Sequence, residues 1–125
     1  MKQKIAIIED EAAIAEMYRF KLEQRGYQVE CALDGKRGLA LVKNFRPDLI
    51  LLDLMMPELT GDAMLEKVRA EEWGGDIRVI VLTNISKDEA PSRLRFLNVD
   101  RYIVKAHHTP TQVASIVGEI LNKPA

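Results

Sequence analysis

Four short apolar runs recur along the chain, and they constrain its fold more than any other feature of the sequence. Each run is too short for a globular helix, and most are rich in β-branched residues. Because apolar residues follow one another without alternating with polar ones, we expect strands that are covered on both faces of a sheet. The runs are residues 5–8, 49–52, 79–82 and 102–104.

A fifth run, residues 28–32, alternates more polar and apolar positions and is typical of an edge strand. Amphipathic helical patterns separate the runs, so strand and helix alternate about five times along the 125 residues. This alternation predicts an α/β fold with a parallel sheet and helices on both faces. The length suits one core, so we predict a single domain over residues 1–125.

The first three helices have recognisable starts and ends. Gly26 ends the first, and the dipeptide Arg46-Pro47 stops the second, which covers residues 34–45. Thr60 is placed to cap the third. The apolar stripes are Ile14, Met17, Tyr18 and Leu22 in the first helix, and Met64, Leu65 and Val68 in the third.

Pro91 fixes the expected start of a fourth helix. If the helix began at Ser86, Pro91 would lie in its interior and remove a hydrogen bond, whereas a start at Asp88 places Pro91 in the first turn. We therefore predict a helix from Asp88. The last helix has the strongest start signal, with Thr109 as cap, proline at the next position and Gln112 completing a capping box.

Charged and polar residues follow the apolar runs where each strand is expected to end. They are Glu9 and Asp10 after the first run, Asp53 after residues 49–52, Thr83 after residues 79–82, and Lys105 after the last run. In open α/β sheets, ligands bind outside the carboxyl ends of the strands. The sequence therefore predicts that three carboxylates, one hydroxyl and one ammonium converge on one edge of the sheet.

The chemistry of this group follows from its charges. Three carboxylates held close together repel one another, and a hard divalent cation such as Mg²⁺ relieves that repulsion. A carboxylate beside a metal ion and an ammonium can act as a nucleophile toward a phosphoryl group, whose oxygens need positive partners. Asp53, on an inner strand, is the best-placed acceptor, with Thr83 and Lys105 as donors to the phosphoryl oxygens.

These residues resemble the receiver domain of two-component response regulators, related to the chemotaxis response regulator. The resemblance covers nearly the whole chain. Its motifs are residues 7–11, residues 53–57 with Gly61, residues 82–83 and residues 102–105, and four motifs in this order and spacing are highly specific. The resemblance implies a five-stranded sheet in the order 2-1-3-4-5, which agrees with residues 28–32 as an edge strand.

The resemblance also implies a role for each matched residue. Glu9 and Asp10 hold Mg²⁺, with Asp53 and the backbone carbonyl of Met55 as further ligands. Asp53 accepts a phosphoryl group from a histidine kinase or phosphotransfer protein, and Thr83 and Lys105 bind that group. Tyr102 is the aromatic residue that turns inward on activation.

The expected output is a change in the face formed by the helix from Asp88, the strand 102–104 and the last helix. Residues on that face include Arg93, Arg95, Phe96 and Arg101. The positions two after the acceptor and two after the threonine influence access of hydrolytic water in this family. Here they are the apolar residues Met55 and Ile85, so we expect a long-lived phosphorylated state.

The loop after Lys105 departs from the family pattern. Ala106 stands where the family usually has proline, often after a cis bond, and a non-proline cis bond costs about 2.5–4 kcal/mol. We therefore expect a trans bond, or a cis bond under visible strain. His107 and His108 follow; adjacent histidines in a polar loop are expected to be exposed, the alternative being a pH-sensitive or metal-binding role.

Composition excludes several classes of protein. Eighteen Lys and Arg against nineteen Asp and Glu give a net charge of −1, which does not suit a nucleic-acid-binding domain. No apolar run approaches the roughly 18 residues that span a bilayer, and the first apolar stretch is too short for a secretory signal. The single cysteine, Cys31, favours a reducing, cytoplasmic location and is expected to be a small apolar residue. Trp73 is expected to cover a helix end.

Two other functions compete with the switch. A phosphatase of the haloacid dehalogenase type needs a second aspartate two residues after its nucleophile, where this chain has Met55. A constitutive interaction module with an unused acidic pocket is kept open by Ala106. We predict a switch rather than an enzyme. This switch is expected to assist its own phosphoryl transfer and its own slow dephosphorylation. Its expected partners are a kinase, a downstream protein or an output domain outside this chain, and a second copy after phosphorylation.

Overall fold

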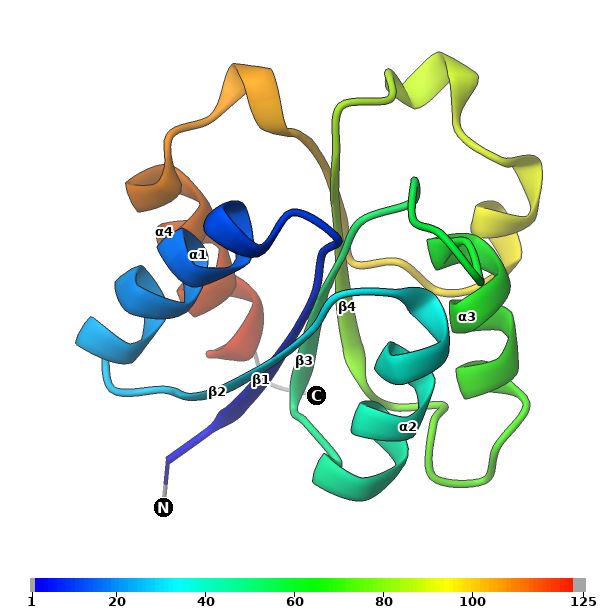
Figure 1. Cartoon of the computed structure of the whole chain (residues 1–125), viewed down its shortest axis with the longest axis horizontal. Coiled ribbons are helices and arrows are strands. Elements are labelled where there is room, and N and C mark those ends of the chain that lie inside the picture. Colours follow the sequence, from blue (N-terminus) through cyan, green and yellow to red (C-terminus); the bar gives the residue numbers. More distant parts are fainter. Residues whose placement is uncertain (1, 123–125) are drawn as a thin grey trace.

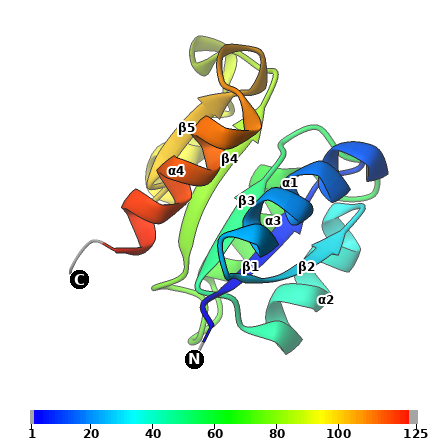
Figure 2. The same ribbon diagram turned by 90° about the vertical axis from the view of Figure 1, so that its left-hand side faces the viewer.

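A computed structural model describes residues 2–122 and shows one parallel sheet with helices on both faces (Figures 1 and 2). The strand order is β2-β1-β3-β4-β5, with β2 and β5 at the two edges. This order and the edge position of β2 confirm the predicted fold. The strands are β1 (Lys4–Ile8), β2 (Gln28–Ala32), β3 (Leu49–Leu52), β4 (Arg78–Thr83) and β5 (Arg101–Val104). Residues 1 and 123–125 of the predicted domain lie outside the described residues.

Two pairs of helices cover the sheet, one pair on each face. Helices α1 (Ala12–Gln24) and α4 (Pro110–Leu121) lie on one side (Figure 2), and α2 (Gly35–Phe45) and α3 (Gly61–Arg69) lie on the other. The strand residues alternate between them, because Ile5 and Ile7 pack with α1 and α4 while Ile8 packs with α2 and α3. All three side chains are buried, which confirms that the continuous apolar runs are strands covered on both faces.

The predicted cap of α4 is confirmed and that of α3 is confirmed in part, and the structure adds a cap at Asp34, the first residue of the predicted second helix. The Asp34 side chain accepts a hydrogen bond from the backbone N–H of Arg37 at 2.7 Å at the start of α2. Thr109 and Gln112 form both bonds of the capping box of α4. Thr60 holds the N-cap position of α3, but its side chain makes no capping hydrogen bond.

The predicted helix from Asp88 is wrong. The segment forms two short 3₁₀ turns, η1 (Lys87–Glu89) and η2 (Ser92–Phe96), joined by extended backbone at Ala90 and Pro91 (ψ 146° and 131°). A proline disfavours the helical region for the residue before it and lacks an N–H of its own. Pro91 therefore divides the segment instead of starting a helix within its first turn.

Two arginines, Arg69 of α3 and Arg93 of η2, hold this irregular segment against α3. The Arg69 guanidinium donates to the carbonyls of Leu97 at 2.9 Å and Asn98 at 3.0 Å. Arg93, in η2, forms an ion pair with the buried Asp62 at 3.0 Å. These contacts join α3 to both ends of η2, so the segment has a defined position without being an α-helix.

Three smaller expectations concern Trp73, Cys31 and the membrane. Trp73 packs against the core beside α2, with the Arg46 guanidinium 4.5 Å from its ring centre, which supports a packing role over a helix end. Cys31 is partly buried on β2, and burial raises the pKa of its thiol to about 11. Within residues 2–122, no helix is long and apolar enough to cross a membrane.

Candidate functional site

The candidate site lies where four neighbouring strands end at the same edge of the sheet. Glu9 follows β1, Asp53 follows β3, Thr83 ends β4 and Lys105 follows β5. All of these strands are parallel, so their carboxyl ends face the same way. The sequence prediction that these residues meet at one edge agrees with this arrangement.

Asp53 lies at the centre of the group and is nearly buried, with 7% of its surface exposed. One carboxylate oxygen, Oδ2, is 3.3 Å from the Lys105 ammonium, and Oδ1 accepts a weak hydrogen bond from the Met55 N–H at 3.4 Å. The Asp53 backbone N–H donates to the carbonyl of Ile8 at 3.0 Å, which continues the β1–β3 pairing by one residue. The sheet thus fixes the position of this carboxylate.

Gly61 allows the loop after Asp53 to fold back closely. A Cβ atom at this position would lie 2.0 Å from the carbonyl oxygen of Asp53, a distance that no side chain can occupy. The Gly61 N–H also donates to the carbonyl of Leu54 at 3.0 Å. A residue without a side chain is therefore required for the start of α3 to pack against the Asp53 backbone.

Glu9 and Lys105 form a buried ion pair. The Lys105 ammonium donates to the Glu9 carboxylate, which also accepts a bond from the backbone N–H of Glu11 at 3.2 Å. Burial raises the pKa of the Glu9 carboxyl, although Lys105 opposes that effect. Burial alone would lower the pKa of Lys105, but its hydrogen bond to Glu9 and the charge of Asp53 outweigh burial and raise it. Lys105 is therefore charged at neutral pH.

Three carboxylates gather tightly enough to hold one cation. Oxygens of Glu9, Asp10 and Asp53 all lie within 4.8 Å of one another, with Asp10 exposed to solvent and the other two buried. An all-oxygen donor set with an exposed side suits a hard divalent cation that keeps part of its water shell. The residues present therefore fit the metal site that the sequence predicts.

Thr83 brings an unusual buried hydroxyl to the same edge. The residue is 1% exposed, and its Oγ1 has no hydrogen-bond partner among the described residues. An unpaired buried hydroxyl costs free energy, so such groups are uncommon in folded proteins. In the sheet Thr83 stands opposite Val104, next to Lys105.

Tyr102 contacts the loop that follows Thr83. Its hydroxyl donates to the carbonyl of Ile85 at 2.7 Å and lies 3.4 Å from that of Ser86. Burial raises the pKa of this phenol, and the charge of Asp53 adds to the effect. The ring is partly buried against the α3 side of the core. Tyr102 thus lies directly against the backbone two residues beyond Thr83.

The remaining predicted residues surround the site. Met55 is 65% exposed, whereas Ile85 packs partly against the core. Ala106 is exposed, and no cis peptide bond occurs in the described part of the chain, so the predicted trans bond is confirmed. His107 is exposed as predicted, but the prediction is wrong for His108. His108 is partly buried, with its Nδ1 atom buried and lacking a partner among residues 2–122.

The sequence pattern predicts Tyr18 only as part of the apolar stripe of the first helix. The structure places this buried residue of α1 beside a small cavity, about 10 Å³, that Glu9 and Asp53 also line. Burial raises the pKa of its phenol; the charge of Lys105 opposes this effect and the charge of Glu9 adds to it. Its place in a helical apolar stripe gave no sign of this contact.

The comparisons with known proteins agree with this geometry. Residues 5–117 match the family model described as the response regulator receiver domain. The chain belongs to this family. It is thus a receiver domain of the kind used in two-component signalling.

Relatives and solved structures support the assignment. This receiver domain is 34% identical to the DNA-binding dual master transcriptional regulator RpaA of Synechocystis, over 90% of this chain and 47% of that protein. It is 32% identical to the phosphate regulon transcriptional regulatory protein PhoB of Rhizobium meliloti, over 93% of this chain and 51% of that protein. The chain therefore spans about half the length of the curated relatives it matches.

Among solved structures, a CheY-like receiver domain protein of Methanospirillum hungatei superposes with a TM-score of 0.89 at 28% identity, covering 98% of this chain and 95% of the other. The chemotaxis response regulator CheY4 of Vibrio cholerae superposes with a TM-score of 0.87 at 25% identity, covering 96% of this chain and 99% of the other. Both are similar to this receiver domain over its full sheet.

Proposed function

We propose that this receiver domain is a phosphorylation-activated switch in which Asp53 accepts a phosphoryl group from a histidine kinase or phosphotransfer protein. The observation that carries the proposal is the position of Asp53. Its nearly buried carboxylate has the Lys105 ammonium at 3.3 Å and shares a tight acidic cluster with Glu9 and Asp10. Cytoplasmic kinase domains are the matching donors, so we place the protein in the cytoplasm.

The transfer needs a nucleophile and donors for the phosphoryl oxygens. An Asp53 carboxylate oxygen forms the new bond to phosphorus while the bond from phosphorus to the donor's imidazole nitrogen breaks. Lys105, already beside Asp53, neutralises charge on the transferred group. The Thr83 hydroxyl, which has no partner among the described residues, is free to donate to a phosphoryl oxygen.

Glu9, Asp10 and Asp53 are proposed to hold Mg²⁺, with the Met55 carbonyl as a further ligand by resemblance to the family. When bound, Mg²⁺ supplies positive charge that offsets the three carboxylates and the incoming phosphoryl oxygens. Lys105 pairs with Glu9 and lies beside Asp53, where its ammonium can reach an oxygen of the transferred phosphoryl group.

The signal is proposed to leave through Thr83, Ile85 and Tyr102. A phosphoryl group adds about −1.5 to −2 charge and strong hydrogen-bond acceptors. It therefore accepts a hydrogen bond from the Thr83 hydroxyl and pulls that side chain toward Asp53. Movement of Thr83 shifts the loop to which the Tyr102 hydroxyl is bonded at Ile85. The affected surface, called here the readout face, consists of η1, η2, β5 and α4, and includes Arg93, Arg95, Phe96 and Arg101.

The readout face is proposed to control an output domain outside this chain, a separate protein or a second copy. The relatives RpaA and PhoB are transcriptional regulators about twice as long as this chain, which favours an output domain. We propose that residues 1–125 form one receiver domain that does not itself bind nucleic acid or a membrane and does not act as an enzyme on other substrates.

Acetyl phosphate tests this function against the two alternatives. With Mg²⁺, intact-mass measurement should show one added phosphoryl group that is lost in Asp53→Asn. Release of phosphate from an unrelated phosphate ester without a lasting adduct would instead indicate a phosphatase. An unchanged mass together with no ester turnover would indicate a constitutive interaction module.

A further inference from the structure

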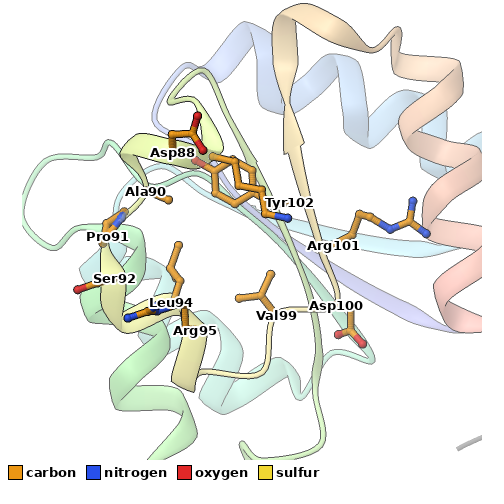
Figure 3. Close-up of a pocket in the computed structure, with 11 residues that line it drawn as sticks. Asp88, Ala90, Pro91, Ser92, Leu94, Arg95, Val99, Asp100, Arg101 and Tyr102 are labelled. Atoms are coloured by element: carbon orange, nitrogen blue, oxygen red, sulfur yellow. The ribbon is translucent and has the colours of Figure 1, made fainter.

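A groove runs along the readout face between β5 and the irregular segment 87–96 (Figure 3). Its volume is about 700 Å³, and apolar residues of both sides line it, among them Ala90, Leu94, Val99 and Tyr102. The groove exists because Pro91 keeps the backbone extended between η1 and η2, where an α-helix was predicted.

One wall of the groove is the open edge of the sheet. Among residues 2–122, strand β5 pairs only with β4, so the backbone groups along its other side have no partner strand there. In Figure 3, Tyr102 points toward η1 while Arg101 points away from the groove toward α4. The Arg101 side chain is instead paired with Glu119 at 3.5 Å. The strand edge is therefore not covered by the Arg101 side chain, and unpaired edges of this kind accept a further strand.

The two ends of the groove differ in charge. Arg95 stands at one end, and no carboxylate in the described part of the chain lies within ion-pair distance of it. Asp100, which also lines the groove, is already paired with Arg78 at 3.2 Å and accepts a hydrogen bond from the backbone N–H of Val79 at 2.8 Å. Asp88 lies at the opposite end, beside Tyr102 (Figure 3). The groove thus offers a free cation at one end and an acid at the other.

We propose that this groove binds an extended segment of a partner protein, which adds as a strand along the edge of β5. Alternate apolar side chains of the segment enter the space between Leu94, Val99 and Tyr102, and an acidic side chain lies beside Arg95. The inference deepens the proposed function, because the groove is part of the readout face, and it names an extended acidic and apolar peptide as the occupant.

Selection of eight-residue peptides from a displayed random library, with the unphosphorylated chain as target, tests the proposal. Enriched peptides should alternate apolar residues and carry an acid toward one end. Added to the isotope-labelled chain, they should shift amide resonances of residues 87–102. Methylation of alternate peptide nitrogens should weaken binding at least tenfold, because it removes the hydrogen bonds to β5.

Matched variants separate the groove from general charge effects. Arg95→Ala should weaken binding about three- to tenfold, whereas Lys43→Ala, an exposed lysine on α2, should leave it unchanged. Asp53→Asn should also leave it unchanged, so that a failure of phosphorylation and a failure of this groove can be told apart. No enrichment, shifts centred on another face, indifference to N-methylation, a helical bound peptide, or occupation of β5 by a second copy would each overturn the proposal.

Discussion

Lys105 places its ammonium 3.3 Å from Asp53 while it also donates to Glu9, so one cation balances two nearly buried carboxylates. Burial of an ion pair is costly, but loss of one partner is more so, because a charge is left without compensation. Lys105 therefore stabilises the same carboxylates that a divalent cation would bind. The fold and the proposed metal site are therefore linked through this one side chain.

Replacement of Lys105 by methionine should expose that link. We expect Lys105→Met to lower the free energy of unfolding by about 3 kcal/mol in metal-free buffer, since Glu9 and Asp53 lose their common partner. Mg²⁺ should then stabilise the variant more than it stabilises the natural chain. Urea unfolding with and without Mg²⁺ measures both effects, and Lys43→Met serves as a surface control expected within about 0.5 kcal/mol of the natural chain. Equal Mg²⁺ effects in the natural chain and Lys105→Met would contradict the link.

Thr83 should show opposite effects on stability and on phosphorylation. Thr83→Val removes a buried hydroxyl that has no partner among the described residues, so the free energy of unfolding should rise by about 1 kcal/mol. The same change should slow phosphorylation by acetyl phosphate, because a donor to the phosphoryl oxygens is lost. Thr83→Ser should restore the rate. If valine left the rate unchanged, Thr83 would have only a structural role.

Replacement of Gly61 by any residue with a side chain should lower the stability of the fold for steric reasons. Gly61→Ala places a Cβ against the Asp53 carbonyl and should cost about 2 kcal/mol or more of unfolding free energy. Gly118→Ala is the matched control, because its Cβ would meet only the Tyr27 hydroxyl at 3.7 Å. Alanine there, within α4, should raise stability by about 0.5–1 kcal/mol. Thermal or urea unfolding distinguishes the two, and equal effects would argue against the close approach.

Met55 and Ile85 should set the lifetime of the phosphorylated state. Both are apolar and neither orients a water molecule, so the double change Met55→Asn and Ile85→Glu should shorten the half-life severalfold. Loss of the phosphoryl group can be followed by intact mass after removal of acetyl phosphate. Met17→Asn, an exposed methionine on α1, is the control. A half-life unchanged by the double substitution would rule out this explanation.

The strands and the residues that follow them were predictable because both depend on local patterns. Continuous apolar runs identified β1, β3, β4 and β5, and parallel strands necessarily bring Glu9, Asp53 and Lys105 to one edge. The capping box of α4 was readable because Thr109 and Gln112 are three residues apart. Such features need no knowledge of tertiary contacts.

The segment after β4 was not predictable in the same way. Asp88 fits a helix cap with Pro91 in the first turn, and only the backbone geometry at Ala90 and Pro91 excludes the helix. The ion pair that holds η2, between Arg93 and Asp62, joins residues 31 positions apart and has no sequence signal. His108 is likewise covered through tertiary packing that its polar neighbours do not reveal.

The most direct test of the switch uses beryllium fluoride, an analogue of the phosphoryl group, with Mg²⁺ and the isotope-labelled chain. We predict that amide resonances shift at Thr83 and Ile85, at Tyr102, and across η2 and β5, and that Asp53→Asn abolishes these shifts. Shifts confined to the surroundings of Asp53, or a spectrum that does not change, would contradict the account.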